Sequence, residues 1–206
     1  LSGITIEDYS KDIDIKLSAL SKSIKNKEFN FSPTRAFLIK KDNGNYRPLQ
    51  IPEIQDRIVL KAIQNIIEGD QNVKISKSKE VSFAYQKGKG VKDALLKLKT
   101  YFHSNAELKY ILKTDIVNFF EEIDKIDLLN NHLFPFLSDN SLNHLIEEAL
   151  DQPLKGLNKI SSNKKHYFKL RKKGIPQGNP LSPFLSNIYL SNFDLHLKEK
   201  GIIHLR

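Results

Sequence analysis

Residues 174–183 read GIPQGNPLSP and lead into the apolar run FLSNIYL at residues 184–190. Two glycines and three prolines restrict this stretch to an unusual loop, with Gln177 in its most constrained part. Such a loop can present a polar side chain and bare backbone to a ligand, while the helix behind it serves as an anchor. Taken alone, however, a Gly/Pro loop is usually only the entry into a helix.

Upstream of this loop, residues 113–120 read KTDIVNFF, and the apolar residues before them predict a buried strand at 108–114 that ends at Asp115. A rigid strand fixes a carboxylate in space, and the strand end opens to solvent and substrate. This arrangement suits a ligand for a divalent metal ion. The alternative is an aspartate that only caps the following turn.

The rest of the chain predicts strands and helices in irregular order. Strands are predicted at residues 35–40 and 46–51 with a hairpin turn at 42–45, a strand begins at 202–205, and a basic strand or hairpin lies at 164–173. Helices are predicted at residues 5–27, 52–68, 91–103, 125–132, 142–150 and 184–200. Because hairpins and helices mix without a regular βαβ alternation, we predict an α+β fold.

The composition narrows the function classes. A formal charge of +9 and a pI near 9.5 favour a polyanionic partner such as nucleic acid, although a generally lysine-rich protein explains the charge equally well. The absence of cysteine excludes disulfides and thiolate chemistry, and the six scattered histidines do not favour a zinc site. No apolar stretch approaches the length of a membrane span, so we expect no membrane partner and a cytoplasmic, prokaryotic protein.

Together and in this order, the two stretches resemble motifs A and B of reverse transcriptases, specifically of the prokaryotic group II intron-like lineage. Residues 41–52 (KDNGNYRPLQIP) and 56–59 (DRIV) are similar to that lineage's fingers hairpin and following helix, and residues 82–88 (SFAYQKG) loosely resemble its next block. The resemblance implies a right-hand polymerase fragment with antiparallel hairpins and a palm sheet packed with helices. Fingers are then expected at residues 1–107 and a partial palm at 108–206.

The resemblance also implies roles for the residues after the expected strand. Asp115 matches the first catalytic carboxylate, which with the main-chain oxygen of Ile116 binds two Mg²⁺ ions in the family. Phe120 matches the bulky residue that lies against the sugar 2′ position and selects deoxynucleotides. The alternative for Phe120 is an ordinary core side chain.

Three further residues match the family's nucleotide pocket. Lys41 and Arg47 correspond to the basic fingers residues that bind the triphosphate, and Gln177 to the motif B glutamine beside the sugar. A solvated hairpin is the alternative for the two cations. The sequence departs from the family at Asn179, where many relatives have Ser, and at Lys40, where a proline is common.

The basic stretch before the loop lies where the resemblance places the template–primer duplex. Its members are Lys164, Lys165, Lys169, Arg171, Lys172 and Lys173. Their charges predict a salt-sensitive, sequence-independent affinity for nucleic acid, and a solvated lysine-rich hairpin is the alternative. The partners implied are an RNA template, a DNA or RNA primer and dNTPs, while a dedicated structured RNA and an oligomer stay open.

The last residues, GIIHLR at 201–206, fit the lead-in to motif C of the family, Tyr-x-Asp-Asp. We therefore expect a fragment of an RNA-directed DNA polymerase that is inactive alone, because its Mg²⁺ ions lack the motif C aspartates. Two other functions stay open. One is a maturase-type RNA-binding protein that assists group II intron splicing, and the other is an antiviral-defence reverse transcriptase.

Overall fold

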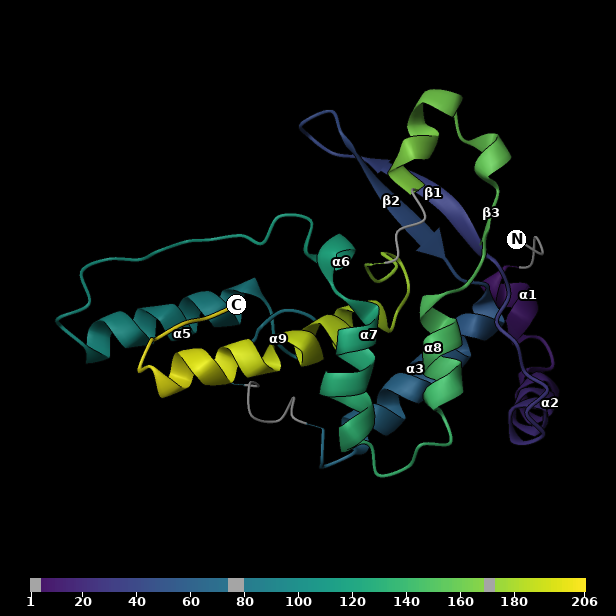
Figure 1. Ribbon diagram of the computed structural model, residues 1–206, viewed down its shortest axis with the longest axis horizontal. Coiled ribbons are helices and arrows are strands. Elements are labelled where there is room, and N and C mark those ends of the chain that lie inside the picture. Colours follow the sequence, from purple (N-terminus) through teal and green to yellow (C-terminus); the bar gives the residue numbers. More distant parts are fainter. Residues whose placement is uncertain (1–4, 74–79, 169–172) are drawn as a thin grey trace. The chain divides into compact units, whose positions relative to one another are not determined.

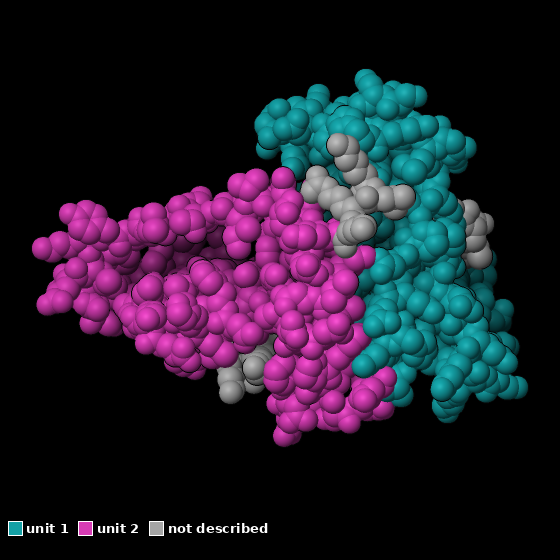
Figure 2. All heavy atoms as spheres, viewed as in Figure 1, with its two compact units in different colours: residues 1–63, 141–172, 176–180 teal, residues 64–140, 173–175, 181–206 magenta. Residues whose placement is uncertain are grey.

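The computed structural model describes residues 5–73, 80–168 and 173–206. Contacts divide the chain into two compact units, which Figure 2 shows in different colours. Unit 1 consists of residues 1–63, 141–172 and 176–180, and unit 2 of residues 64–140, 173–175 and 181–206. The units interleave along the chain, and the expected division into fingers at 1–107 and palm at 108–206 stays a prediction.

The described part of unit 1 contains a three-stranded sheet with the order β2-β1-β3 (Figure 1). Strands β1 (Thr34–Lys40) and β2 (Tyr46–Ile51) pair antiparallel, with Lys40 opposite Tyr46. Strand β3 (Leu154–Lys155) adds to the other edge of β1 in parallel. The predicted pair of strands is confirmed, whereas β3 was not predicted.

The turn between β1 and β2 closes as its residues predict. The Lys41 main-chain N–H donates to the Asn45 carbonyl oxygen at 2.7 Å, and Gly44 takes a left-handed conformation with φ +83°. Glycine adopts this region without steric cost, which makes the turn a local property of the sequence.

The β1–β2 hairpin has one covered and one open face. On β1, Thr34 and Ala36 are buried, whereas Phe37 is 47% and Ile39 is 44% exposed. Because side chains alternate across a strand and directly paired residues share a face, Arg47 lies on the open face with its partner Ile39.

The N-terminal helix predicted at residues 5–27 is interrupted. It forms α1 (Ile6–Ser10) and α2 (Ile13–Lys25), with Asp12 between them in a left-handed conformation at φ 55°. Thr5 caps the start of α1, because its hydroxyl oxygen accepts from the Asp8 N–H at 3.0 Å. The prediction of one helix was wrong. The apolar residues keep their helical spacing on both sides of Asp12, so the sequence pattern does not reveal the break that the φ angle of this residue introduces.

Helices α3 (Ile54–Gly69) and α8 (Asn143–Leu150) agree with the predicted helices. Residues 54–63 of α3 and all of α8 belong to unit 1. Their buried apolar residues in this unit are Val59, Leu60, Ile63, Leu145, Ile146, Ala149 and Leu150. At roughly 1.5–3 kcal/mol for each large side chain removed from water, these two helices supply much of the unit's hydrophobic stabilisation.

After β3, the chain forms two short 3₁₀ helices, η3 (Leu157–Lys159) and η4 (Ser162–Phe168). The basic strand or hairpin predicted at residues 164–173 is therefore wrong for residues 164–168, which are helical. Residues 169–172 lie outside the described ranges.

Unit 2 is mostly helical. It contains α5 (Val91–Ser104), α6 (Phe119–Glu122), α7 (Lys125–Asp127), the π-helix η1 (Leu128–Leu133), the 3₁₀ helix η2 (Phe134–Phe136) and α9 (Ser182–Glu199). The helix predicted at residues 125–132 is thus observed as α7 followed by the π-helix η1. Helix α9 contacts η1 and buries Leu185 and Ile188 completely or almost so.

The strand predicted at residues 108–114 is wrong. Residues 109–116 have no regular secondary structure, and Tyr110 is 91% and Leu112 is 88% exposed. A strand requires a neighbour for its N–H and C=O groups, and no strand among the described residues pairs with this segment.

The strand expected to begin at residues 202–205 is also absent. Only Arg206 pairs in a strand-like manner. Its N–H donates to the Val81 carbonyl oxygen at 2.9 Å, and its carbonyl oxygen accepts from the Phe83 N–H at 2.6 Å. Among the helices of the described ranges, none combines the length and apolarity that crossing a membrane requires.

Candidate nucleotide and nucleic-acid site

Residues 176–180 of the Gly/Pro loop pack on the edge of β2 within unit 1. The Gln50 main-chain N–H donates to the Gln177 carbonyl oxygen at 2.7 Å. Gly178 lies beside the same residue with φ +97°, and a Cβ atom there would lie 2.8 Å from the Gln50 carbonyl oxygen. The loop needs glycine at this position because both the conformation and the space exclude a side chain.

Asn179 fixes the other side of this loop. Its side chain is buried, and its Nδ2 donates to the Ala149 carbonyl oxygen at 2.7 Å. Ala149 belongs to the last turn of α8, where carbonyl groups lack partners within the helix. The amide thus satisfies a helix end and ties the loop to α8.

The two predicted triphosphate ligands lie on the hairpin of unit 1. Arg47 is exposed on β2, as expected. Lys41 is exposed as well, but it is the first residue of the turn and lies one position beyond the end of β1. Gln177 is half-buried and is bonded through its main chain to Gln50, three positions along β2 from Arg47.

Asp115 lies in unit 2 and is exposed, in an irregular segment rather than at a strand end. The next residue, Ile116, is 52% exposed. The chain then turns at Asn118, which has φ 52°, and enters α6.

Phe120 lies in α6, where the chain meets the start of the Gly/Pro loop. Its carbonyl oxygen accepts from the Ile175 N–H at 2.8 Å, and the Ile123 carbonyl oxygen accepts from the Gly174 N–H at 2.7 Å. A Cβ atom on Gly174 would lie 2.9 Å from the Glu121 carbonyl oxygen. Within unit 2, the segment after Asp115 and the start of the loop are therefore bonded directly.

The ring of Phe120 contacts two other aromatic rings edge-on. Its centroid lies 5.8 Å from that of Phe119 and 6.2 Å from that of Tyr85. Both phenylalanines are helical, so their side chains do not alternate between two sides as neighbouring residues of an extended backbone do. Tyr85 was not predicted as a site residue, although it lies in the segment that resembled a family block.

The predicted nucleic-acid ligands are described only in part. In unit 1, the Lys164 Nζ donates to the Tyr46 hydroxyl oxygen at 2.8 Å, and this bond holds the pKa of Tyr46 below its usual value. Lys165 and Lys173 are exposed. The remaining predicted ligands, Lys169, Arg171 and Lys172, lie outside the described residues.

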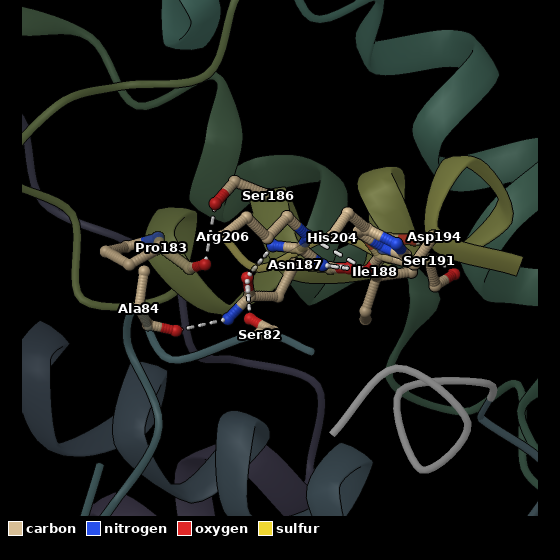
Figure 3. Close-up of polar contacts among 10 residues, drawn as sticks. All are labelled: Ser82, Ala84, Pro183, Ser186, Asn187, Ile188, Ser191, Asp194, His204 and Arg206. Atoms are coloured by element: carbon tan, nitrogen blue, oxygen red, sulfur yellow. Dashed lines mark hydrogen bonds and ion pairs between the residues drawn. The ribbon is translucent and has the colours of Figure 1, made fainter. Parts of the chain in front are cut away.

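A buried polar network in unit 2 joins α9 to the last residues (Figure 3). The Arg206 guanidinium bonds both carboxylate oxygens of Asp194 at 2.7–2.9 Å and the Asn187 side-chain oxygen at 2.6 Å. Asn187 also accepts from the Ser82 hydroxyl and donates to the Ala84 carbonyl oxygen. Such bidentate charge-assisted bonds are among the strongest hydrogen bonds in proteins, so they hold three separate segments together.

No group of three or more His, Asp or Glu side chains arranged for a metal ion occurs among the described residues. The Asp115 carboxylate and the Ile116 carbonyl oxygen are the hard oxygen ligands that Mg²⁺ prefers. By themselves they do not complete a coordination shell. The residues present therefore supply the right type of ligand for Mg²⁺ but too few ligand atoms.

Comparison with known proteins identifies the class. Residues 39–206 match the family described as reverse transcriptase (RNA-dependent DNA polymerase). The chain therefore belongs to the reverse transcriptase family, and the resemblance inferred from its motifs is confirmed.

Curated relatives include a protein encoded by a group II intron. The chain is 26% identical over 200 residues to the group II intron-encoded protein LtrA of Lactococcus lactis subsp. cremoris, covering 95% of this chain and 30% of that protein. It is 27% identical over 192 residues to the protein YkfC of Escherichia coli (strain K12), covering 90% and 46% respectively. The chain thus spans less than half the length of these relatives.

A solved structure described as a partial Cas6-RT-Cas1--Cas2 complex is similar in fold. The TM-score is 0.50 at 22% sequence identity, over 90% of this chain and 30% of that one. This likeness confirms the α+β fold of a reverse transcriptase fingers and palm fragment.

Proposed function

We propose that the protein containing this chain is an RNA-directed DNA polymerase that transfers nucleotides from dNTPs to a primer 3′-OH on an RNA template. The chain contributes the fingers and the front of the palm. Membership of the reverse transcriptase family supports the proposal, and the short span of the chain relative to its relatives makes the activity one of the longer protein.

The main support is the junction between β2 and the Gly/Pro loop. The bond from Gln50 to Gln177 brings the loop to the strand that carries Arg47. Arg47 and Gln177, which are distant in the sequence, thus belong to two hydrogen-bonded neighbouring segments of unit 1. Preorganised groups of this kind bind a ligand without the cost of ordering two separate segments.

In this proposal, Arg47 and Lys41 bind the triphosphate of the incoming nucleotide through charge-assisted hydrogen bonds. Gln177 lies beside the sugar. Phe120 excludes a 2′-hydroxyl by its volume, and its contacts with Phe119 and Tyr85 restrict the positions that the ring can take.

Asp115 and Ile116 are the proposed ligands of Mg²⁺ in the longer protein, where further oxygen ligands complete the site. The donor set in the described residues is too small for a metal centre. We therefore assign no catalytic step to the ion. Lys164, Lys165, Lys169, Arg171, Lys172 and Lys173 are the proposed contacts of the template–primer backbone.

Substitution of Arg47 tests the pocket in the full-length protein. Arg47→Ala should raise KM for dNTPs in primer extension by about 10–100-fold, because loss of a hydrogen bond to a charged group costs about 1.5–3 kcal/mol. Lys25→Ala, which removes an exposed cation from α2 in the same unit, should leave KM unchanged. If both variants behave alike, the hairpin cation does not contact the nucleotide.

A maturase-type function is a second candidate, because one matched relative is named a group II intron-encoded protein. In this role the basic surface binds intron RNA and assists splicing. Polymerisation and splicing assistance can occur in one protein, because the first transfers nucleotides and the second requires only RNA binding.

A further inference from the structure

Three aromatic side chains of unit 1 pack together, one from the start of β2 and two from η4. The rings of Tyr46 and Tyr167 meet edge-on, with centroids 5.6 Å apart and planes at 64°. The His166 imidazole stacks on Tyr167 with centroids 4.3 Å apart and planes at 34°. Tyr46 and Tyr167 are half-buried, whereas His166 is exposed. We call these three residues the ring cluster, and its imidazole forms the exposed end.

One lysine contacts the ring cluster, and two more are neighbours of its residues. The Lys164 Nζ lies 4.2 Å from the centroid of the Tyr46 ring and is bonded to its hydroxyl. Lys40 pairs with Tyr46 across the hairpin and is exposed, and Lys165 is exposed next to His166. The cluster therefore combines a flat aromatic surface with charges that can contact phosphate groups.

We propose that the ring cluster is a stacking site for an unpaired base of single-stranded nucleic acid, with the base on His166 and the backbone along Lys40 and Lys165. Aromatic rings combined with a basic surface bind single strands with little sequence preference, because every base has a π-face. Stacking on a supported ring costs little conformational entropy, and the contact with Tyr167 holds the imidazole in place.

The ring cluster is separate from the proposed triphosphate ligands. Tyr46 and Arg47 are consecutive on β2, so their side chains point to opposite faces of the sheet. Arg47 shares the open face with Ile39, whereas Tyr46 shares the other face with Lys40 and packs against η4. The inference rests on the proposed function for its choice of nucleic acid as the partner. The contact it adds is to the single-stranded nucleic acid and not to the dNTP.

The test measures the affinity of the full-length protein for labelled single strands by fluorescence anisotropy, without dNTPs and at one salt concentration. The probes are oligoadenylate RNA, the DNA strand of the same sequence, and a DNA strand of equal length with abasic sites. His166→Ala should weaken binding of the strands with bases about tenfold, within the range of one lost stacking contact. Its affinity for the abasic strand should equal that of the wild type. His166→Phe should restore tight binding, because the phenyl ring keeps the stacking surface.

Two further variants control for charge and for loss of an exposed histidine. Lys165→Gln should weaken binding of abasic and base-containing strands to the same extent, since it removes only a backbone contact. His144→Ala removes an exposed histidine of α8 in the same unit and should leave all affinities unchanged. If His166→Ala weakens binding of the oligoadenylate RNA alone, the site is specific for RNA. If it weakens binding of both the RNA and the DNA strand of the same sequence, the site accepts either nucleic acid.

The proposal is overturned if His166→Ala weakens the abasic strand equally, if it changes nothing, or if His166→Phe binds as weakly as His166→Ala. Primer extension by the same wild-type preparation separates this result from the proposed function. Stacking without any primer extension leaves the ring cluster in place and contradicts the polymerase. Primer extension with no effect of His166→Ala on binding contradicts the ring cluster alone.

Discussion

Gly178 allows the Gly/Pro loop to approach β2 because it has no side chain. Two separate effects exclude alanine there: the left-handed φ of +97°, and the 2.8 Å approach of a Cβ atom to the Gln50 carbonyl oxygen. A non-glycine residue in left-handed backbone costs about 1–2 kcal/mol, and overpacking adds about 1–3 kcal/mol.

We therefore expect Gly178→Ala to lower the free energy of unfolding by about 2–5 kcal/mol, as measured by urea denaturation of the full-length protein. Gly44→Ala is the matched control. Gly44 has φ +83°, and a Cβ atom there would have no neighbour within 4 Å, so only the cost of about 1–2 kcal/mol for the conformation applies. Equal losses for the two variants would contradict the close approach of the loop to β2.

Asp56 is a buried carboxyl group in unit 1. Its Oδ2 accepts from the Ser32 N–H at 3.0 Å and from the Gln152 Nε2 at 3.3 Å. Burial outweighs these bonds and raises the pKa of Asp56 to about 6, against an ordinary value of 3.8. Between these two pH values the folded protein retains a proton that the unfolded chain has released.

The contribution of Asp56 to stability therefore decreases as the pH rises from about 4 to 6 and is constant above that. At 1.36 kcal/mol for each pH unit, the loss is at most about 3 kcal/mol. Asp56→Asn keeps an oxygen acceptor and removes the charge, so it should raise the melting temperature of the full-length protein at pH 7. Near pH 4 the variant and the wild type should melt together. Melting curves that differ by the same amount at both pH values would mean that ionisation of Asp56 is not the cause.

Phe120 tests the selection of the sugar. Phe120→Val in the full-length protein should raise the ratio of kcat/KM for rNTPs over dNTPs by roughly 5–150-fold, from relief of about 1–3 kcal/mol of overpacking. Phe119→Val is the control, because its neighbouring side chain points in a different direction around α6 and should affect stability rather than selectivity. An unchanged ratio for Phe120→Val would make this residue an ordinary core side chain, and the opposite pattern would exchange the roles of the two rings.

At the scale of elements, the sequence predicted best what depends on neighbouring residues. The turn at Gly44 and the lengths of β1 and β2 follow from local turn chemistry and alternation. The long helix α9 follows from an uninterrupted apolar pattern, although it begins two residues earlier than expected. The two-residue strand β3 is too short to give a pattern of its own.

Elements that depend on distant partners were predicted poorly. Residues 108–114 have the composition of a strand, but composition does not provide the neighbouring strand that the backbone requires. The buried side chains of Asn187 and Asp194 on α9 were also missed. Their polar character is explained by partners outside α9, which include Arg206 and Ser82.

The predicted site residues divide between the two units at the scale of the whole molecule. Lys41, Arg47 and Gln177 lie in unit 1, whereas Asp115 and Phe120 lie in unit 2. Their roles came from the family resemblance, since no single local pattern distinguishes a catalytic aspartate from a capping one. Membership of the reverse transcriptase family supports these roles as a set. The role of each residue is tested separately by a variant at that position.

The measurement that tests the central claim most directly is primer extension on an RNA template by the full-length protein and its Asp115→Asn variant. The amide is a poor metal ligand, so nucleotide addition should fall by more than the roughly 10–100-fold that loss of an outer-shell partner costs. Affinity for the template–primer duplex should stay close to that of the wild type, because it comes from the basic surface. Glu147→Gln, which neutralises an exposed carboxylate of α8, should extend primers normally. Near wild-type nucleotide addition by Asp115→Asn would contradict the account.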